Sequence, residues 1–438
     1  MKILSPSKYW LFFIFSASLF LRFLGIGQID NAVFDEIFYP QYGLMYLQGK
    51  EFFYAHPPLA NYLYSISIWV YSLLPGSNIE SLQTIEFSAL NPISYRWLNA
   101  LLGSLLPLII YKISFLLSRN LLFALLCACL IAIEGSLIVD SRIALANIFL
   151  LTFGFASLYF LLRFYLLENQ TSNLIIASVF MGMVISVKWS GLGFLLVAFF
   201  IMAIMELKEQ KKPEIRHFIY VLFFTILAYT LLFVPDLYLN ENYGLFEKHR
   251  QILSYHQTMV TENEHPYCSK WFTWPLMMRP VGYYFDNTMI DQGGIAASYF
   301  TTIHLLPNAF IYWFSTLAIT VMIVSQTINI VLKKIGDQKK QILSAVIGFG
   351  YLANLLPWAF IDRCLFLYHY QPASIFGFIA LAWYLSELLN SNKSAYRLLA
   401  ISLMVVIVLS FLYWLPFHMG FSIPEYEFSR RMWFESWI

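Results

Sequence analysis

Long apolar runs separated by short polar segments recur along almost the whole chain. Most of these runs are close to the roughly 20 residues that a helix needs to cross the hydrocarbon core of a bilayer. The pattern predicts eleven spans, at about residues 9–26, 97–117, 121–139, 143–166, 173–187, 190–206, 217–235, 306–332, 341–358, 365–388 and 398–415. Because no internal repeat, low-complexity tract or separate soluble segment is visible, we expect residues 1–438 to form a single domain.

Composition agrees with this pattern. Hydrophobic residues make up 59% of the 438 residues and charged residues only 12%. In soluble domains about half of the residues are apolar and about a quarter are charged. The net charge is only +2, and Lys and Arg occur in short clusters rather than on one basic face, so nucleic-acid binding has no support. The sequence therefore predicts an all-α polytopic membrane protein whose partners lie in or beside the lipid.

The positive charges give the predicted spans an orientation, because cytoplasmic loops are enriched in Lys and Arg. With eleven spans and a cytoplasmic N-terminus, every cluster falls on the cytoplasmic side: Arg119, Lys208, Lys211, Lys212, Arg216, Lys333, Lys334, Lys339, Lys340, Lys393 and Arg397. The first run follows Lys2 and Lys8 and lacks a small-residue cleavage site, so we expect a retained signal anchor. Two long loops, 27–95 and 236–305, then lie outside, and Pro58 to Leu74 is expected to form an interfacial helix.

The cysteines and histidines predict no metal site. Cys127 and Cys129 lie in an apolar run, where Cys behaves as a small hydrophobic residue. Sequence alone cannot fix a pairing of Cys268 with Cys364, and we do not expect a disulfide there. The outer-loop histidines include no pair at i,i+4 spacing of the kind that binds zinc.

Ionisable residues gather at the outer ends of the predicted spans and in the first outer loop. A charge at the centre of a span costs about 2.5 kcal/mol or more, so such groups usually face a protein interior or a water-filled cavity. The set comprises Asp35, Glu36, Arg96, Glu134, Asp140, Arg142, Lys188, Asp362, Arg363 and His369. We expect one shared polar cavity on the outer side. The alternatives are that single Arg or Lys side chains snorkel to the interface and that the acidic pair is solvated in the loop.

This charge pattern suggests chemistry on a lipid phosphate. Arginine forks bind phosphate through paired charge-assisted hydrogen bonds, and Arg96, Arg142, Lys188 and Arg363 are the candidate cations. Either carboxylate of the acidic pair can serve as general base toward an acceptor hydroxyl. We expect a low pKa for a carboxylate beside cations, so that positioning and electrostatic stabilisation supply much of the rate.

Short motifs follow one another in a fixed order along nearly the whole chain. They are Phe34-Asp35-Glu36, His56-Pro57-Pro58-Leu59, Tyr95-Arg96-Trp97, Asp140-Ser141-Arg142, Leu145-Ala146-Asn147, Ser186-Val187-Lys188-Trp189-Ser190-Gly191, His265-Pro266-Tyr267, Trp274-Pro275-Leu276, Arg279-Pro280, Leu356-Pro357-Trp358 and Arg363 to Tyr368-His369-Tyr370. This ordered set resembles the protein O-mannosyltransferases of glycosyltransferase family 39, within the GT-C superfamily of polytopic membrane glycosyltransferases.

The resemblance implies a GT-C fold with about eleven transmembrane helices and two large extracytoplasmic loops. It implies an inverting transfer of mannose from polyprenyl-phosphate-mannose to Ser or Thr hydroxyls of exported proteins. The enzyme would lie in the cell membrane with its active site on the extracytoplasmic face. Neither a cofactor nor a metal is expected, because cations already stabilise the leaving phosphate.

Residue roles follow from the resemblance together with the charge pattern. Asp35 is the implied catalytic base, with Glu36 as its acidic neighbour. The predicted donor-phosphate contacts are Arg96, Arg142, Lys188 and Arg363, and the predicted substrate-cavity residues are His56, Asp140, Asn147, His265 and His369.

Two features depart from the family pattern, and two other functions stay open. The family commonly has an Asp where Asn147 stands, and Asn can accept a hydrogen bond but cannot act as a base. Loop 236–305 leaves no room for the MIR domain of eukaryotic members, so the chain resembles the bacterial type. One alternative is a GT-C transferase that uses the same donor on a glycolipid or lipopolysaccharide acceptor. A secondary transporter is less favoured, because no repeat is visible and the charges lie at one face.

Overall fold

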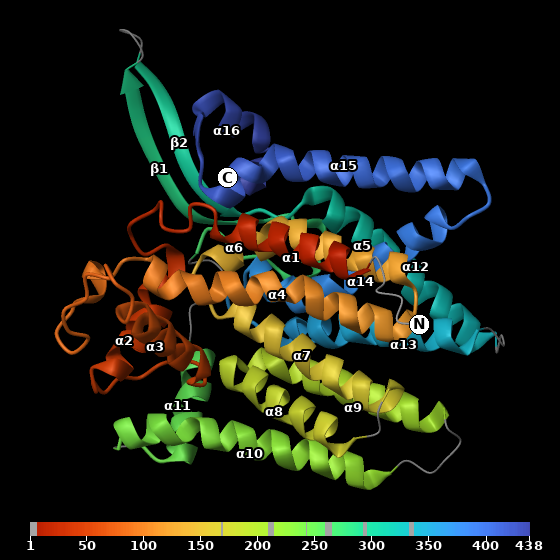
Figure 1. Cartoon of the computed structure of the whole chain (residues 1–438), viewed down its shortest axis with the longest axis horizontal. Helices are drawn as coiled ribbons and strands as arrows, with labels where there is room; N and C mark the ends of the chain where they lie inside the picture. The colour runs from red at the N-terminus through yellow and green to blue at the C-terminus, as the bar shows by residue number, and fades with distance from the viewer. Residues whose placement is uncertain are drawn as a thin grey trace.

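Long helices packed side by side form the body of the molecule (Figure 1). The computed structural model describes residues 7–167, 170–208, 214–241, 243–258, 265–291, 296–332 and 337–438. In these ranges eight helices are long and apolar enough to cross a membrane. They are α4 (Ile93–Ser118), α7 (Asn147–Leu166), α9 (Leu192–Lys208) taken with the turn Trp189–Gly191 before it, α10 (Ile215–Leu239), α12 (Ala309–Val331), α13 (Gln338–Leu355), α14 (Gln371–Leu389) and α15 (Ser394–Met419).

Three further apolar segments complete the correspondence with the sequence. Helices α5 (Leu121–Ile133) and α6 (Gly135–Arg142) meet at a bend of 55° and count as a ninth span if taken together. Helices α1 (Ser7–Phe23) and α8 (Thr171–Val187) are apolar but shorter. Each of the eleven predicted runs therefore contains a helix. The multi-pass helical architecture is confirmed, whereas a count of eleven spans stays a prediction.

The bend between α5 and α6 is fixed by a buried carboxylate. Glu134 adopts an extended backbone between the two helices, and its side chain accepts hydrogen bonds from the backbone N–H of Ser136 (3.1 Å) and Leu137 (2.9 Å). A third backbone N–H, that of Asn308 at the start of α12, donates to it at 3.2 Å. These bonds satisfy N–H groups that a helix start leaves unpaired. Glu134 is therefore a buried cap, not a member of the shared polar cavity that we expected.

The described residues of the predicted basic clusters lie at helix ends on one face. This face also holds the N-terminus (Figure 1). The residues are Arg119, Lys208, Arg216, Lys339, Lys340, Lys393 and Arg397; Lys211, Lys212, Lys333 and Lys334 lie outside the described residues. Gathering the basic ends on one face is what the positive-inside pattern predicts.

The opposite face carries the elements of the outer loops and of the C-terminal segment. They are η1 (Phe34–Ile37), α2 (Tyr39–Leu47), α3 (Leu59–Ser72), η2 (Phe87–Ala89), α11 (Leu245–Thr258), η4 (Trp271–Leu276), η5 (Leu356–Phe360), η6 (Leu367–Tyr370), α16 (Glu425–Arg431) and η7 (Glu435–Trp437). The short turn η3 (Trp189–Gly191) joins α8 to α9. Helix α3 agrees with the helix predicted from Pro58 to Leu74.

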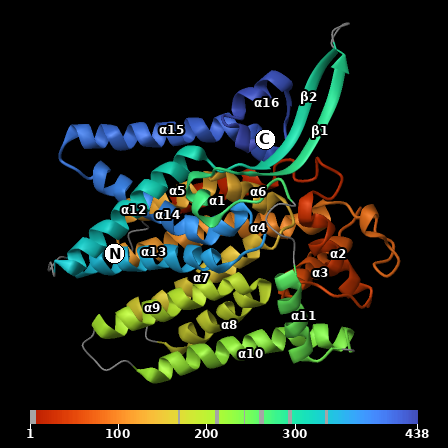
Figure 2. The ribbon, with the colours of Figure 1, turned by 180° about the vertical axis from the view of Figure 1, so that it is seen from behind.

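A β-hairpin also rises from this face, which the all-α expectation did not include. Strand β1 (Val281–Asp291) pairs with β2 (Ala296–Leu305) in antiparallel register from Val281↔Leu305 to Asp291↔Ala296. Strand β3 (Ser422–Pro424) adds to the other side of β2, giving the order β1-β2-β3. The hairpin projects well beyond the helical body (Figure 2).

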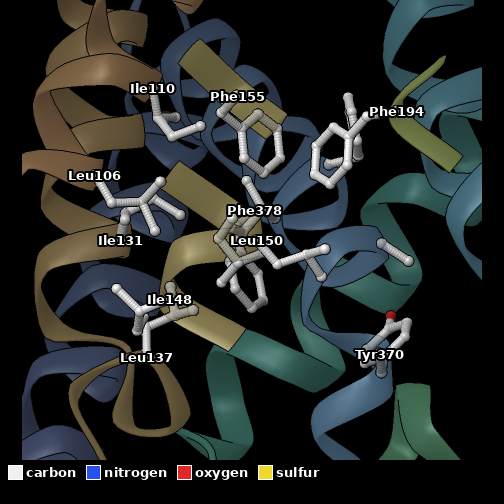
Figure 3. Packing of buried hydrophobic residues seen from close by; sticks show 14 of the residues in the cluster. Leu106, Ile110, Ile131, Leu137, Ile148, Leu150, Phe155, Phe194, Tyr370 and Phe378 are labelled. Atoms are coloured by element: carbon white, nitrogen blue, oxygen red, sulfur yellow. The ribbon is translucent and has the colours of Figure 1, made fainter. Parts of the chain in front are cut away.

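Helices α7 and α14 form the centre of the core. Over their most apolar stretches 78% and 72% of the residues are buried, against 17% for the peripheral α10. Side chains from α4, α5, α7, α9 and α14, including Ile110, Phe155 and Phe378, interdigitate there (Figure 3). Gly154 permits the close approach of α9, because a Cβ at this position would lie 2.6 Å from the ring of Phe194. The buried helices hold in fixed positions the residues at their outer ends.

A disulfide joins Cys268 to Cys364, with the Cα atoms 5.2 Å apart. This corrects the expectation that the two cysteines would not pair. Long-range folding brings together two loops that are 96 residues apart in sequence, and sequence separation alone gives no indication of that. The bond ties the segment before η4 to the loop that carries Arg363.

Replacing Cys268 and Cys364 together by Ser is expected to lower the free energy of unfolding by about 2–4 kcal/mol, because an unlinked unfolded chain gains loop entropy. Thermal unfolding in detergent should show a lower Tm, and a reductant should lower the Tm of the unsubstituted protein to the same level. Cys129→Ser, at an exposed unpaired cysteine, is the matched control. An unchanged Tm in the double variant would contradict the prediction.

Candidate active site

Asp35 lies in the one-turn helix η1, whose conformation is fixed on both sides. Phe34 has a φ of 53°, in the left-handed region that non-glycine residues rarely adopt. Its ring stacks on Tyr283 with centroids 4.5 Å apart. On the other side, Glu36 accepts a hydrogen bond from the backbone N–H of Val33 at 2.8 Å. Such backbone strain is common at functional sites, where surrounding contacts maintain it.

The carboxylate of Asp35 is half-buried and accepts no hydrogen bond from any residue in the described part of the chain. Burial raises its pKa to about 6, against the opposing effect of the Lys188 ammonium and with a further increase from the Asp140 carboxylate. This corrects the expectation of a low pKa, because desolvation outweighs the nearby cation. A carboxylate with a pKa near 6 is a better general base than an ordinary Asp.

Glu36 and Arg96 form a buried ion pair. The guanidinium Nε and Nη2 of Arg96 donate to the two carboxylate oxygens at 2.8 and 2.7 Å. The remaining N–H groups donate to the backbone carbonyls of Ile26, Ile29 and Asn31. All five donors of the guanidinium are thus used inside the protein. The backbone N–H of Ala144 also donates to Glu36, at 2.7 Å.

Arg142 is committed in the same way. Its guanidinium donates to carbonyl oxygens at and beyond the end of α1, including Leu24 and Gly25, and to Met419 at the end of α15. Cations at helix C-termini satisfy carbonyls that the helix leaves unpaired. Two of the three arginines predicted to contact the donor phosphate, Arg96 and Arg142, are therefore bonded to protein groups that fix η1 and the helix ends around it.

Lys188, Asn147 and Asp140 form a hydrogen-bonded chain beside Asp35. The Lys188 ammonium donates to Asn147 Oδ1 at 2.9 Å, and Asn147 Nδ2 donates to Asp140 Oδ2 at 2.8 Å. The Tyr283 hydroxyl donates to the other Asp140 oxygen at 2.8 Å. The side-chain amide of Asn accepts from the ammonium and donates to the carboxylate at once, whereas an ionised carboxylate can only accept. Asn147 thus joins two charged groups in a way that the Asp common in the family does only when protonated.

Aromatic rings enclose the Lys188 ammonium. It lies 5.6 Å from the ring centroid of Tyr39 and 5.5 Å from that of Tyr368, distances at which a cation is attracted to an aromatic face. The sequence assigned none of these tyrosines, nor Tyr283, to the site, although Tyr368 stands in one of the ordered motifs. With 29 tyrosines in the chain, residue type gives no signal, and only the tertiary contacts identify them.

The histidines divide between the wall of the site and its surroundings. His56 packs against Tyr39 and Tyr54 and lies 5.2 Å, ring to ring, from His256, which the sequence did not assign to the site. Burial, with a further contribution from Lys188, holds the pKa of His56 well below its usual range. His369 packs on Trp358, with centroids 4.4 Å apart. His265 lies further out, against Tyr267 and Phe366.

Two cavities lie next to this cluster, and Trp358 lines both. The small inner one is bordered by Asn147, Lys188, Tyr368 and His369. The outer one has a volume of about 300 Å³. Its lining includes Trp271, Phe272, Asp362, Arg363 and the Cys268–Cys364 disulfide. The structure therefore brings together Asp35, Asp140, Lys188, His56, His369 and Arg363, while Arg96, Arg142 and Glu134 are bonded elsewhere.

Comparisons with solved structures agree on the fold. The Saccharomyces cerevisiae protein O-mannosyltransferase Pmt1-Pmt2 complex bound to the sugar donor superimposes with a TM-score of 0.84, at 14% identity over 100% of this chain and 93% of the other. ArnT from Cupriavidus metallidurans bound to undecaprenyl phosphate gives 0.56, at 12% identity over 94% of this chain and 75% of the other. The predicted GT-C fold is thereby confirmed.

Sequence comparisons cover nearly the whole chain. The family described as dolichyl-phosphate-mannose-protein mannosyltransferase matches residues 12–254, and the C-terminal four TMM region of protein-O-mannosyltransferase matches residues 241–437. A polyprenol-phosphate-mannose–protein mannosyltransferase of Corynebacterium glutamicum is 24% identical over 91% of this chain and 82% of its own length. One of Mycolicibacterium smegmatis is 23% identical over 95% and 90%. This chain belongs to the protein O-mannosyltransferase family.

Proposed function

We propose that this protein transfers mannose from polyprenyl-phosphate-mannose to Ser or Thr hydroxyls of exported proteins, with Asp35 as the general base. The observation that carries the proposal is the half-buried carboxylate of Asp35, which has no hydrogen-bond partner among the described residues and a pKa raised to about 6 beside Lys188. Membership of the family and the names of its relatives support the donor and the reaction.

The reaction balances as a single displacement. Asp35 takes the proton of the acceptor hydroxyl as its oxygen attacks the anomeric carbon from the face opposite the phosphate. The bond between that carbon and the phosphate oxygen breaks, and the electron pair leaves on the lipid phosphate. The product is therefore inverted at the anomeric carbon. The Lys188 ammonium stabilises the charge that develops on the departing phosphate.

Lys188 and Arg363 are the donor-phosphate contacts in this proposal, whereas Arg96 and Arg142 shape the scaffold. Arg363 lines the outer cavity of about 300 Å³, and Trp358 lines both this cavity and the smaller one beside Lys188. Phe272 and Ile361, which line this cavity, are exposed. An apolar surface next to an arginine suits a polyprenyl chain that ends in a phosphate.

We also propose that the N-terminus is cytoplasmic and that the site faces the outside of the cell membrane. The basic helix ends gather on the face opposite the site, which supports this orientation.

The direct test is an assay in detergent with radiolabelled polyprenyl-phosphate-mannose and a Ser/Thr-rich peptide. We expect labelled peptide that releases mannose on β-elimination, as an O-linked sugar does. Transfer to a glycolipid or lipopolysaccharide acceptor but not to any peptide would replace the proposal with the other transferase function. Solute uptake into liposomes without sugar transfer would favour transport instead.

The value of kcat/KM is expected to rise with pH, with an apparent pKa of about 6, and to level off above it. The sign follows from the role of Asp35, because a general base acts only when deprotonated and its pKa is raised to about 6. Measurements of kcat/KM for the peptide acceptor from pH 5 to 8, with saturating donor, give this rise, the acid limb of the pH profile. His256→Gln is the control, since an ordinary histidine titrates in the same range. Loss of the limb in His256→Gln would contradict the assignment to Asp35.

A further inference from the structure

Strand β1 lies at the free edge of the three-stranded sheet. The order is β1-β2-β3, so within the described part of the chain β1 pairs with β2 alone. It is the outermost strand in both views (Figures 1 and 2). Residues 285–289 are all exposed, although side chains of a strand alternate between its two faces. Apart from the ring of Phe285, which contacts Phe300 and Phe428, this part of β1 is therefore open to solvent on both faces and along one edge.

Natural proteins usually protect such an edge. Proline, lysine and very short strands are the common means, because an open row of backbone N–H and C=O groups invites another chain to pair. The eleven residues of β1, Val281–Asp291, include neither proline nor lysine. The only irregularity in its pairing lies between Gly282 and Tyr284, at the base of the strand. Within 285–289 the edge therefore carries one charged residue, Asp286, and no other protecting feature.

The base of β1 forms part of the candidate active site. The irregularity places Tyr283 out of register, and its side chain is buried. Its hydroxyl donates to Asp140 at 2.8 Å and its ring stacks on Phe34, the residue before Asp35. A bulge of this kind redirects a side chain next to a site. The free edge therefore begins at the catalytic turn and leads away from it.

We propose that the acceptor polypeptide binds in an extended conformation along the free edge of β1, as an added strand. Backbone hydrogen bonds along 285–289 would align the segment, and Tyr283 at the base of the strand would direct its hydroxyl-bearing residue to Asp35. The inference rests on the proposed function and defines its partner as an unfolded or extended Ser/Thr-bearing segment.

Strand addition would allow one site to accept many acceptor sequences. Recognition by main-chain hydrogen bonds is insensitive to side chains, apart from the pockets that alternate residues enter. Five residues of an antiparallel strand span roughly 17 Å, at about 3.4 Å per residue. An acceptor therefore needs about five extended residues on one side of its Ser or Thr, and a peptide without them loses the edge contacts.

The first test leaves the protein unchanged and uses acceptor peptides with single backbone N-methyl groups. In an added strand, alternate N–H groups point toward the partner strand. An N-methyl group on a residue whose N–H points toward β1 is expected to raise KM about two- to tenfold, the effect of one lost hydrogen bond. An N-methyl group on the residues between them, whose N–H points away from β1, should have little effect. An equal response at every position, or none, would overturn the proposal. Mannosylation of the unmethylated peptide in the same assay confirms the function separately.

The second test uses Asp286→Pro and Asn287→Pro. Neighbouring residues of a strand direct their N–H groups to opposite edges, so one proline breaks the pairing with β2 and the other alters only the free edge. The proline that leaves Tm unchanged should raise KM for the long peptide about two- to tenfold, and transfer to a short acceptor without flanking residues should be unaffected. An unchanged KM in both variants would overturn the proposal. A change in oligomeric mass in place of the change in KM would also overturn it, and would identify the edge as an interface between copies of the chain.

Discussion

Asp35→Asn is expected to reduce transfer of mannose by about 10²- to 10⁴-fold, the usual contribution of a general base. Asn keeps the size and shape of the side chain but cannot take a proton from the acceptor hydroxyl. Because Lys188 and the aromatic walls of the site remain, donor binding should change little, and the loss should appear in kcat. Initial rates with saturating polyprenyl-phosphate-mannose and a peptide acceptor measure it.

The same substitution should leave the protein as stable as before or make it more stable. The pKa of Asp35 is raised from 3.8 to about 6 in the folded protein. Between these values the folded state binds more protons than the unfolded state, so stability falls as the pH rises and stays lower above pH 6. Asn removes this cost. A thermal unfolding curve at pH 7.5 therefore separates loss of the base from loss of the fold.

Asp35→Glu is the matched comparison. It keeps a base but moves the carboxylate by one methylene group, so part of the activity and the pH limb should remain. Full activity in Asp35→Asn, with an unchanged Tm, would show that Asp35 is not the base. The proposed reaction would then need another group to accept the proton.

Arg96→Met is expected to lower the free energy of unfolding by about 3–5 kcal/mol. Removing one partner of a buried ion pair leaves the other as an uncompensated buried charge, and the Glu36 and Arg96 side chains are only 0% and 2% exposed. The variant also loses the hydrogen bonds to the carbonyls of Ile26, Ile29 and Asn31. Thermal and denaturant unfolding in detergent measure the loss, and activity should fall with the folded fraction.

A double substitution separates this structural role from phosphate binding. Combining Glu36→Gln with Arg96→Met removes both charges. The free energy of unfolding should therefore fall by less in the double variant than the sum of the decreases in the two single variants. Arg250→Met, which breaks an exposed pair with Glu247, is the control and should leave Tm unchanged. If Arg96→Met folds normally and instead raises KM for the lipid donor, Arg96 contacts the phosphate as the sequence predicts.

The positions of the helices could be predicted from local sequence. Hydropathy is a property of about 20 consecutive residues, so each predicted run contains a helix, from α1 to α15. The ordered motifs were equally informative about the family, and the Asp35 motif identified the turn that becomes η1. The hairpin was missed because the alternation in β1 is weak and its partner β2 becomes evident only once the two strands pair.

The sequence by itself determined a multi-pass helical membrane protein of this family, with the ionisable residues of the candidate site at the outer ends of the helices. Only the tertiary structure decided how those residues divide. Arg96 and Glu36 neutralise each other, Glu134 caps a helix, and Asp35 keeps a free carboxylate beside Lys188. The physical reason is that a residue's charge is set by its type, whereas its partners and its exposure to water depend on which distant segments pack against it.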